Sequence, residues 1–374
     1  MAQALMSAIP PIPINHDRLQ ETFVALLAVD SYYGDEERVV EVIKARMDGL
    51  GVSWRSDPHG NLIGTWPARG KEAEPLILNA HMDTVLPTPN MVPIVKPDGV
   101  YSDGSSVLGA DDKAGVAAIM EAIQAFHDSN EPHGPIELLF TTGEDVGHIG
   151  SKAFDAQDVV SRRCFVFDAG GPVGTVVMRA PGQRRFVMTF KGKAAHAGVE
   201  PELGISAIAI AARAIDQMPL GRVDETTTAN VGTIEGGQAY NIVAPEATVT
   251  VESRSLSEER LERQVTDVTN AATQAAETYG GTVEIETHTF YTAYELEESD
   301  PAVQLADTAI EAAGMTTQHV STGGGSDAHE FNEKGITSVC LGMGYIDVHS
   351  VNEFMPHNAL RDATRMAVEL IRHG

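Results

Sequence analysis

The chain has 374 residues, enough for two domains, and its 53 acidic and 26 basic side chains give it a formal net charge of −27. This charge argues against a nucleic-acid partner and against an anionic membrane surface. No apolar run reaches the roughly 18 residues that a membrane span requires. The two cysteines provide no disulfide framework, and residues 1–13 lack the pattern of a signal peptide, so we expect a cytoplasmic protein.

The N-terminal part of the chain alternates between helical and strand patterns. Asn15 is placed to cap a helix with apolar residues at helical spacing, and a second helix begins after residues 34–36. Residues 61–66 and 76–80 have the apolar character of buried strands. This alternation predicts an α/β domain with a parallel or mixed sheet, in which ligands bind beyond the carboxyl ends of the strands.

His81 and Asp83 follow directly after the predicted strand at residues 76–80. Residues two positions apart on a strand point to the same side of the sheet. Asp83 can therefore contact the imidazole of His81 from behind and fix which ring nitrogen is free to bind a metal. The alternative is a strand with a polar end that is simply hydrated.

Two adjacent acids, Asp111 and Asp112, precede a predicted helix at residues 116–127, and a glycine lies on either side of the pair at positions 109 and 115. The alternative is that both acids stabilise the helix dipole, worth about 0.3–1 kcal/mol each. Capping needs no second acid, and the glycines allow a close approach of the backbone to another group. We therefore expect Asp111 to bind a metal ion.

Two further predicted strands also end at acids. Residues 136–141 lead to Glu144 and Asp145, and residues 163–167 lead to Asp168. Adjacent residues in an extended chain point in opposite directions, so one of Glu144 and Asp145 would bind metal and the other would face the substrate. A hydrated turn is the alternative at each place alone, but the recurrence of such ends along the chain favours one metal centre.

A change of composition indicates an inserted domain over residues 181–292, with residues 1–180 and 293–374 forming the first domain. The insert is predicted to follow the βαββαβ order of a ferredoxin-like sandwich. The returning chain is predicted to start a helix with Asp300 as its cap and to close with another helix at residues 359–372.

The motifs resemble those of the co-catalytic zinc peptidases, a family that includes tripeptide aminopeptidase (peptidase T), bacterial zinc carboxypeptidases, succinyl-diaminopimelate desuccinylase and aminoacylase. The resemblance covers nearly the whole chain and rests on six places: Ala80–Asp83, Gly109–Gly115, Glu144–Gly147, Phe167–Gly170, Ala194–Gly198 and His349. The segment Ala-Asp-Asp-Lys-Ala-Gly-Val is most similar to the peptidase T branch. The resemblance implies an α/β catalytic domain, with a central mixed sheet flanked by helices, and an inserted dimerisation, or lid, domain.

The resemblance also implies metal ligands. Asp111 would bridge two Zn²⁺ ions. His81 and Asp168 would complete the protein ligands of one ion, and Asp145 and His349 those of the other. The family more often has Glu where Asp145 stands, and Asp is one methylene shorter, so the geometry at that ion stays open. Imidazole and carboxylate ligands without a thiolate suit zinc, with Co²⁺ or Mn²⁺ as possible substitutes.

The same resemblance assigns catalytic roles. Glu144 would be the general base, which takes a proton from a metal-bridging water as that water attacks the scissile carbonyl. Asp83 would orient His81. His196 matches a lid histidine that reaches into the site of the partner subunit.

Substrate contacts follow more loosely from the resemblance. Asn241 and Arg254 are similar to lid residues that bind the carboxylate of the substrate. The loop Gly323–Asp327, with Gly324 and Ser326, is similar to a loop that lines the pocket.

The resemblance therefore implies a homodimeric metalloenzyme that hydrolyses short peptides, a tripeptide aminopeptidase of the peptidase T type. Within hydrolases, the alternative is an N-acyl amino acid deacylase or a carboxypeptidase with the same di-zinc centre. From another class, the alternative is an inactive metal-binding homologue. The remaining histidines are assigned to surface or packing positions, with His148 kept as an exception because it lies close to Glu144 in the sequence.

Overall fold

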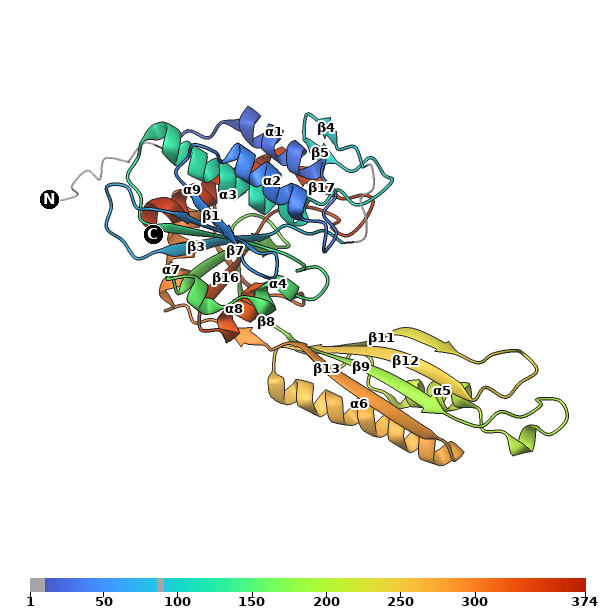
Figure 1. The fold of residues 1–374 in the computed structure, drawn as a ribbon. Helices are drawn as coiled ribbons and strands as arrows, with labels where there is room; N and C mark the ends of the chain where they lie inside the picture. The colour runs from blue at the N-terminus through green and yellow to red at the C-terminus, as the bar shows by residue number, and fades with distance from the viewer. Residues whose placement is uncertain (1–10, 86–90) are drawn as a thin grey trace. The chain divides into compact units, whose positions relative to one another are not determined.

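The computed structural model describes residues 11–85 and 91–374, so most of the segment 1–13, predicted to carry no signal peptide, lies outside the described residues. The chain forms two compact units (Figure 1). The first unit contains the described residues up to Met178, together with Leu296–Val320 and Ser326–Gly374. The second unit contains Arg179–Glu295 and Ser321–Gly325.

The short loop Ser321–Gly325 belongs to the second unit, whereas the predicted organisation assigned all residues after 292 to the first domain. Two contacts explain why the loop groups with the second unit. Thr322 N donates to Arg179 O over 3.0 Å, and Arg254 Nη1 donates to Gly323 O over 3.0 Å.

A mixed sheet forms the centre of the first unit and continues along β8 to β14, in the order β1-β2-β6-β3-β7-β16-β8-β14. The parallel pairs are β3 with β6, β3 with β7, and β7 with β16. Every residue of β3 and β6 is buried, as expected for strands covered on both faces. The strands are β1 (Ser53–Ser56), β2 (Leu62–Trp66), β3 (Leu76–His81), β6 (Ile136–Thr141), β7 (Arg163–Ala169), β8 (Thr175–Ala180), β14 (Tyr294–Glu295) and β16 (Thr337–Gly342), with β15 (Gln318–Ser321) paired to β8.

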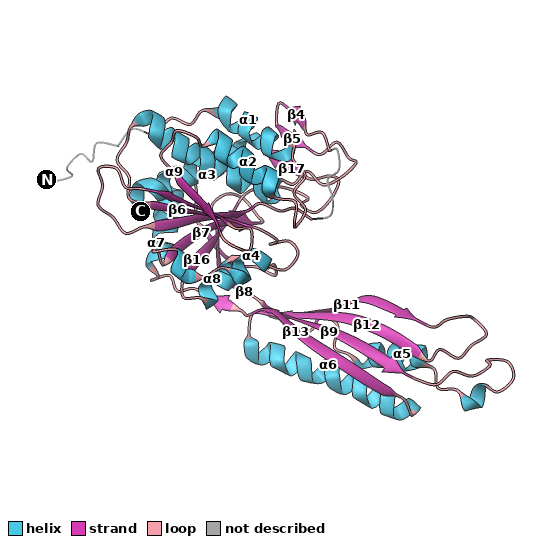
Figure 2. Ribbon diagram, in the orientation of Figure 1, coloured by secondary structure: helices cyan, strands magenta, loops and turns pink. Residues whose placement is uncertain are grey.

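Helices flank this sheet on both faces (Figure 2). On one face, α3 packs against β3, and α1 and α9 pack against α3. On the other face, α8 packs against β16 and contacts α4. The helices are α1 (His16–Leu27), α2 (Glu37–Arg46), α3 (Ala110–Ser129), α4 (Ile149–Ala153), α7 (Pro301–Ala312), α8 (Ala328–Glu333) and α9 (His357–His373), with the 3-10 turn η1 (Ala156–Asp158).

A small sheet joins two distant parts of the first unit. Its strands are β4 (Ile94–Lys96), β5 (Gly99–Tyr101) and β17 (Phe354–Pro356), in the order β17-β5-β4. β17 follows closely after His349, and β5 precedes the segment that carries Asp111. The small sheet thus brings together the two loops that carry these residues.

The second unit has the predicted βαββαβ order. β9 (Gly182–Lys191), α5 (Ala207–Gln217), β11 (Thr227–Gly236), β12 (Glu246–Ser255), α6 (Glu258–Tyr279) and β13 (Thr282–Tyr291) follow one another, with the short β10 (Gly221–Arg222) and the 3-10 turn η2 (Pro201–Leu203) added. The sheet order is β10-β11-β12-β9-β13, with antiparallel pairs throughout. Helices α5 and α6 pack on this sheet over a core that includes Phe186, Met188, Phe190, Val249 and Val268. This is a ferredoxin-like sandwich.

Two predicted helix caps have different outcomes. The side chain of Asn15 accepts a hydrogen bond from Arg18 N over 3.1 Å, which confirms its capping role. Asp300 is the N-cap residue of α7, as predicted, but its side chain makes no capping hydrogen bond and accepts instead from Glu297 N over 2.8 Å. Within the described residues, none of the helices combines the length and apolar character needed to cross a membrane.

Candidate metal centre

Parallel strands bring the predicted site residues to one edge of the sheet of the first unit. His81 is the last residue of β3, Asp168 lies near the end of β7, and Asp145 follows β6 closely. Because β3 is parallel to both β6 and β7, the carboxyl ends of these strands meet. Asp111 lies at the start of α3, and His349 lies in the loop between β16 and β17.

Asp111 contacts two histidines, one through each carboxylate oxygen. Its Oδ1 lies 3.2 Å from His81 Nε2, and its Oδ2 lies 3.1 Å from His349 Nε2. His81 Nε2 is also 3.7 Å from Asp168 Oδ1, and His349 Nε2 is 3.1 Å from Asp145 Oδ1. The five predicted ligands therefore form two groups of three, which share Asp111. These groups are His81–Asp111–Asp168 and Asp111–Asp145–His349. Within each group the ligand atoms lie within 4.8 Å of one another.

The buried carboxyl groups of this cluster favour the binding of a positively charged ion. Burial, together with the nearby carboxylates of Glu144 and Asp111, raises the pKa of Asp168 well above its usual value. Burial also raises the pKa of Asp145 to about 7, although a hydrogen bond from His349 opposes the shift. Several acids are thus held out of water beside one another, and a cation would relieve their repulsion.

The residues present also fit a metal ion by their chemistry. Asp145 Oδ2 is buried and has no hydrogen-bond partner among the described residues, so it has an unused lone pair inside the cluster. The candidate groups found in residues 11–85 and 91–374 contain only imidazole and carboxylate donors. This set suits zinc, cobalt or manganese.

Asp83 supports the cluster through its backbone as well as its carboxylate. Its Oδ1 accepts from Glu144 N over 2.9 Å, and its Oδ2 accepts from Asp145 N over 3.1 Å. His81 Nδ1 lies 3.0 Å from Asp83 O and 3.4 Å from Asp83 Oδ1. Asp83 therefore joins the end of β3 to the segment after β6, and its carbonyl is the nearer partner of the imidazole.

Asp112 has a structural role that differs from that of its neighbour Asp111. Asp112 Oδ1 accepts from Gly115 N over 3.2 Å, and Oδ2 accepts from His81 N over 3.3 Å. A Cβ at Gly115 would lie 2.5 Å from Asp112 Oδ1 and 2.8 Å from Phe167 O. Asp111 thus faces the two histidines, whereas Asp112 links the start of α3 to the end of β3.

Comparison with known proteins places this geometry in a family. The model of "Peptidase family M20/M25/M40" matches residues 77–373, most of the chain. The chain belongs to this family. The predicted family, the mixed α/β fold and the hydrolase class are therefore confirmed: this member of the peptidase family is a hydrolase of the metallopeptidase type.

Three relatives of this peptidase cover nearly its whole length. The aminopeptidase PepT from Bacillus cereus ATCC 10987 is 38% identical, with a TM-score of 0.88 over 96% of this chain and 99% of that one. A tripeptidase from Staphylococcus aureus subsp. aureus Mu50 is 38% identical, with a TM-score of 0.92 over 96% of this chain and 98% of that one. The uncharacterized protein YqjE of Bacillus subtilis (strain 168) is 40% identical over 96% of this chain and 99% of its own.

Glu144 lies beside the two ligand groups and belongs to neither of them among the described residues. It is 9% exposed, and its Oε1 lies 3.2 Å from His148 Nε2. The other ring nitrogen, Nδ1, lies 3.2 Å from Glu330 Oε1. His148, which was kept apart from the other histidines because of its place in the sequence, thus contacts the predicted general base of this peptidase.

Sequence reasoning missed Glu353, which is 1% exposed. Its Oε2 accepts from Leu108 N over 2.7 Å and from Gly109 N over 2.9 Å, and its Oε1 accepts from Asp111 N over 3.1 Å. It anchors the loop that places Asp111. The signal in the sequence was an acid four residues after His349, at the start of an apolar segment.

The predicted substrate residues divide between the two units. His196, Asn241, Arg254 and Gly324 belong to the second unit and are exposed or half-buried. Ser326 belongs to the first unit, is 4% exposed, and donates through its backbone N to His329 Nδ1 over 3.2 Å. Their substrate contacts stay predictions.

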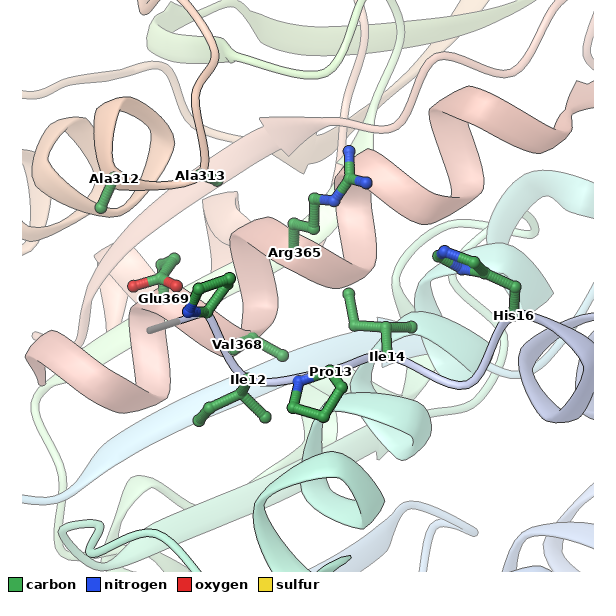
Figure 3. Close-up of a pocket in the computed structure, with 10 residues that line it drawn as sticks. Ile12, Pro13, Ile14, His16, Ala312, Ala313, Arg365, Val368 and Glu369 are labelled. Atoms are coloured by element: carbon green, nitrogen blue, oxygen red, sulfur yellow. The ribbon is translucent and has the colours of Figure 1, made fainter. Parts of the chain in front are cut away.

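A separate pocket of about 340 Å³ lies beside the segment before α1 (Figure 3). Ile12, Pro13 and Ile14 form one wall, and Arg365 and Val368 of α9 form another. The pocket contains no predicted site residue of this peptidase. The cluster of predicted ligands around Asp111, and not this pocket, is therefore the candidate site.

Proposed function

We propose that this chain is a metal-dependent aminopeptidase that hydrolyses short peptides, tripeptides among them. The observation that carries the proposal is the placement of Asp111, with one carboxylate oxygen toward His81 and the other toward His349. A carboxylate shared in this way can hold two cations roughly 3.5–4 Å apart. The likeness to an aminopeptidase PepT and to a tripeptidase supports the choice of substrate.

The two ions would be Zn²⁺, with Co²⁺ or Mn²⁺ as substitutes. One would be held by His81 and Asp168, the other by Asp145 and His349, and both by Asp111. When bound, the ions would supply Lewis acidity, which lowers the pKa of water and polarises the scissile carbonyl.

Glu144 would handle the proton of the reaction. It accepts a proton from the attacking water as the new C–O bond forms, and it donates that proton to the amine as the C–N bond breaks. Its position outside both ligand groups leaves its carboxylate available for this transfer. Asp83 would hold Glu144 in place through the hydrogen bond from Glu144 N.

The second unit would provide dimerisation and substrate binding. A homodimer through this unit would let His196 stabilise the developing oxyanion in the site of a partner chain. Asn241 and Arg254 would bind the substrate carboxylate, with Gly324 and Ser326 lining the pocket. A cytoplasmic location, expected from the acidic composition, belongs to the same proposal.

A substrate screen with the metal-loaded protein tests this function. Hydrolysis of di- and tripeptides with a free N-terminus, and failure on N-acylated substrates, supports an aminopeptidase. A preference for N-acyl amino acids supports the deacylase alternative, and release of C-terminal residues from blocked peptides supports a carboxypeptidase. Bound metal without hydrolysis of any substrate supports an inactive homologue.

The variant E144A tests the mechanism. It should abolish turnover while the metal content, measured by elemental analysis, stays near two ions per chain. Full activity in E144A would refute the role of Glu144 as general base.

A further inference from the structure

A buried histidine connects two glutamates behind the candidate metal centre. His148 Nε2 lies 3.2 Å from Glu144 Oε1, and His148 Nδ1 lies 3.2 Å from Glu330 Oε1. The three residues are 3%, 9% and 5% exposed, in the order His148, Glu144, Glu330. Both nitrogens of one imidazole are thus directed at carboxylates in a place with little access to water.

The local backbone is arranged to bring His148 to Glu144. The chain turns tightly after β6, and both Gly147 N and His148 N donate to Glu144 O over 2.9 Å. His148 takes φ 59° and ψ 38°, a left-handed conformation that glycine adopts more easily. Histidine adopts this conformation more often than most residues other than glycine, so the tight turn accommodates it.

Glu330 comes from a different element, α8, which contacts α4 (Figure 1). The pair His148–Glu330 therefore joins α8 to the residue that precedes α4, which is distant from it in sequence. The contact of Glu330 with His148 Nδ1 fixes the orientation of the imidazole ring from the side opposite to Glu144.

The protonation of His148 agrees with this geometry. Burial by itself would lower the pKa of His148, but hydrogen bonds to Glu144 and Glu330 raise it to about 9. The imidazole then carries a proton on each nitrogen near neutral pH and donates to both carboxylates.

We propose that His148, held by Glu330, is a positioning residue that fixes the carboxylate of Glu144 for its proton transfer. The donor at Nε2 engages Oε1 of Glu144 and leaves Oε2 as the oxygen that accepts the proton of water. The proposal rests on the proposed function, in which Glu144 is the general base. It concerns a residue that contacts the predicted base, Glu144, through its imidazole ring.

The variant H148N tests the role of the ring. Asparagine tolerates the left-handed backbone but is too short to span the two glutamates. We expect kcat to fall about 10- to 100-fold, the size usual for loss of a partner that orients a catalytic group, with KM and metal content nearly unchanged.

A double-mutant cycle separates positioning from general stability. E330Q keeps an acceptor oxygen but removes the charge, so its loss of kcat should be smaller than that of H148N. Because Glu330 acts through His148, H148N/E330Q should match H148N within about twofold. Independent, multiplying losses would overturn the proposal.

His133 provides a matched control, since it is also a buried histidine of the first unit. It is 1% exposed and stacks on Trp66 with ring centroids 3.6 Å apart. H133N should lower the melting temperature and leave kcat of the folded protein unchanged. If H148N lowers only the melting temperature, as H133N does, the positioning role is wrong.

The variant E144Q distinguishes the failure of this inference from that of the proposed function. If E144Q is inactive and H148N retains wild-type kcat, only the role of His148 is refuted. If E144Q retains activity, or if the wild type hydrolyses no peptide, the proposed function is wrong and the positioning role falls with it.

Discussion

Replacing Glu353 by alanine should weaken both the first unit and its metal centre. The carboxylate accepts three backbone hydrogen bonds, from Leu108, Gly109 and Asp111, and it is buried. In E353A, these three N–H groups lose their acceptor in a place that water reaches poorly. The loop that carries Asp111 loses its anchor at the same time.

The number of lost hydrogen bonds sets the expected loss in the free energy of unfolding. A buried donor left without a partner costs about 1–3 kcal/mol, so three of them predict a loss of roughly 3–9 kcal/mol in the free energy of unfolding. This is a large share of the roughly 5–15 kcal/mol that stabilises an ordinary domain. We also expect metal affinity to fall about 10- to 100-fold, since Asp111 would no longer be held in place.

Glu137 offers a matched control on β6. It is 7% exposed, and its carboxylate accepts from Val160 N and from Ser161 N, each over 2.8 Å. E137A should therefore cost roughly 2–6 kcal/mol by the same reasoning, without any effect on metal affinity.

Urea titration followed by tryptophan fluorescence measures the stability. Both tryptophans, Trp54 and Trp66, belong to the first unit, so the signal reports on that unit. The titration is done with chelator present, and metal binding is measured separately by calorimetry. Unchanged stability in E353A, or an equal loss of metal affinity in E137A and E353A, would refute the reasoning.

Two other predictions follow from the proposed function and from the packing. If His196 acts across a dimer, mixing inactive H196A chains with inactive E144A chains should restore part of the activity in heterodimers; no recovery after subunit exchange would count against the cross-subunit role. G115A should cost about 1–3 kcal/mol through overpacking and weaken metal binding, because the new Cβ would lie 2.5 Å from Asp112 Oδ1. In G170A, where a Cβ meets nothing within 4 Å, stability measured by the same urea titration should stay near that of the wild type.

The parts of the site that the sequence predicted share one physical cause. In a parallel sheet, the residues that follow apolar strands meet at one edge, so a local pattern carries three-dimensional information. This is why His81, Asp145 and Asp168 could be grouped from the amino-acid sequence alone. The ferredoxin-like order of the second unit was predictable for a similar reason, since its strands and helices have distinct periodicities.

The parts that the sequence did not predict depend on contacts between distant residues. Glu353 and Gly109 are 244 positions apart, and Glu330 and His148 are 182 apart. No local periodicity marks an acid that accepts backbone hydrogen bonds from such a distance. The side chain of Asp300, at the N-cap of α7, makes no capping bond for the opposite reason: it accepts from a nearby donor, Glu297 N, outside the helix.

The position of the second unit within the chain determines the order in which a ribosome delivers the predicted metal ligands. His81, Asp111, Asp145 and Asp168 all emerge before Arg179–Glu295, whereas His349 emerges after it. The ferredoxin-like sandwich is contiguous apart from one short loop, so it can form during synthesis while the sheet of the first unit still lacks β16. A nascent chain stalled after the second unit would therefore carry His81, Asp111, Asp145 and Asp168 without His349. Translation thus completes the predicted group His81–Asp111–Asp168 before the group that needs His349.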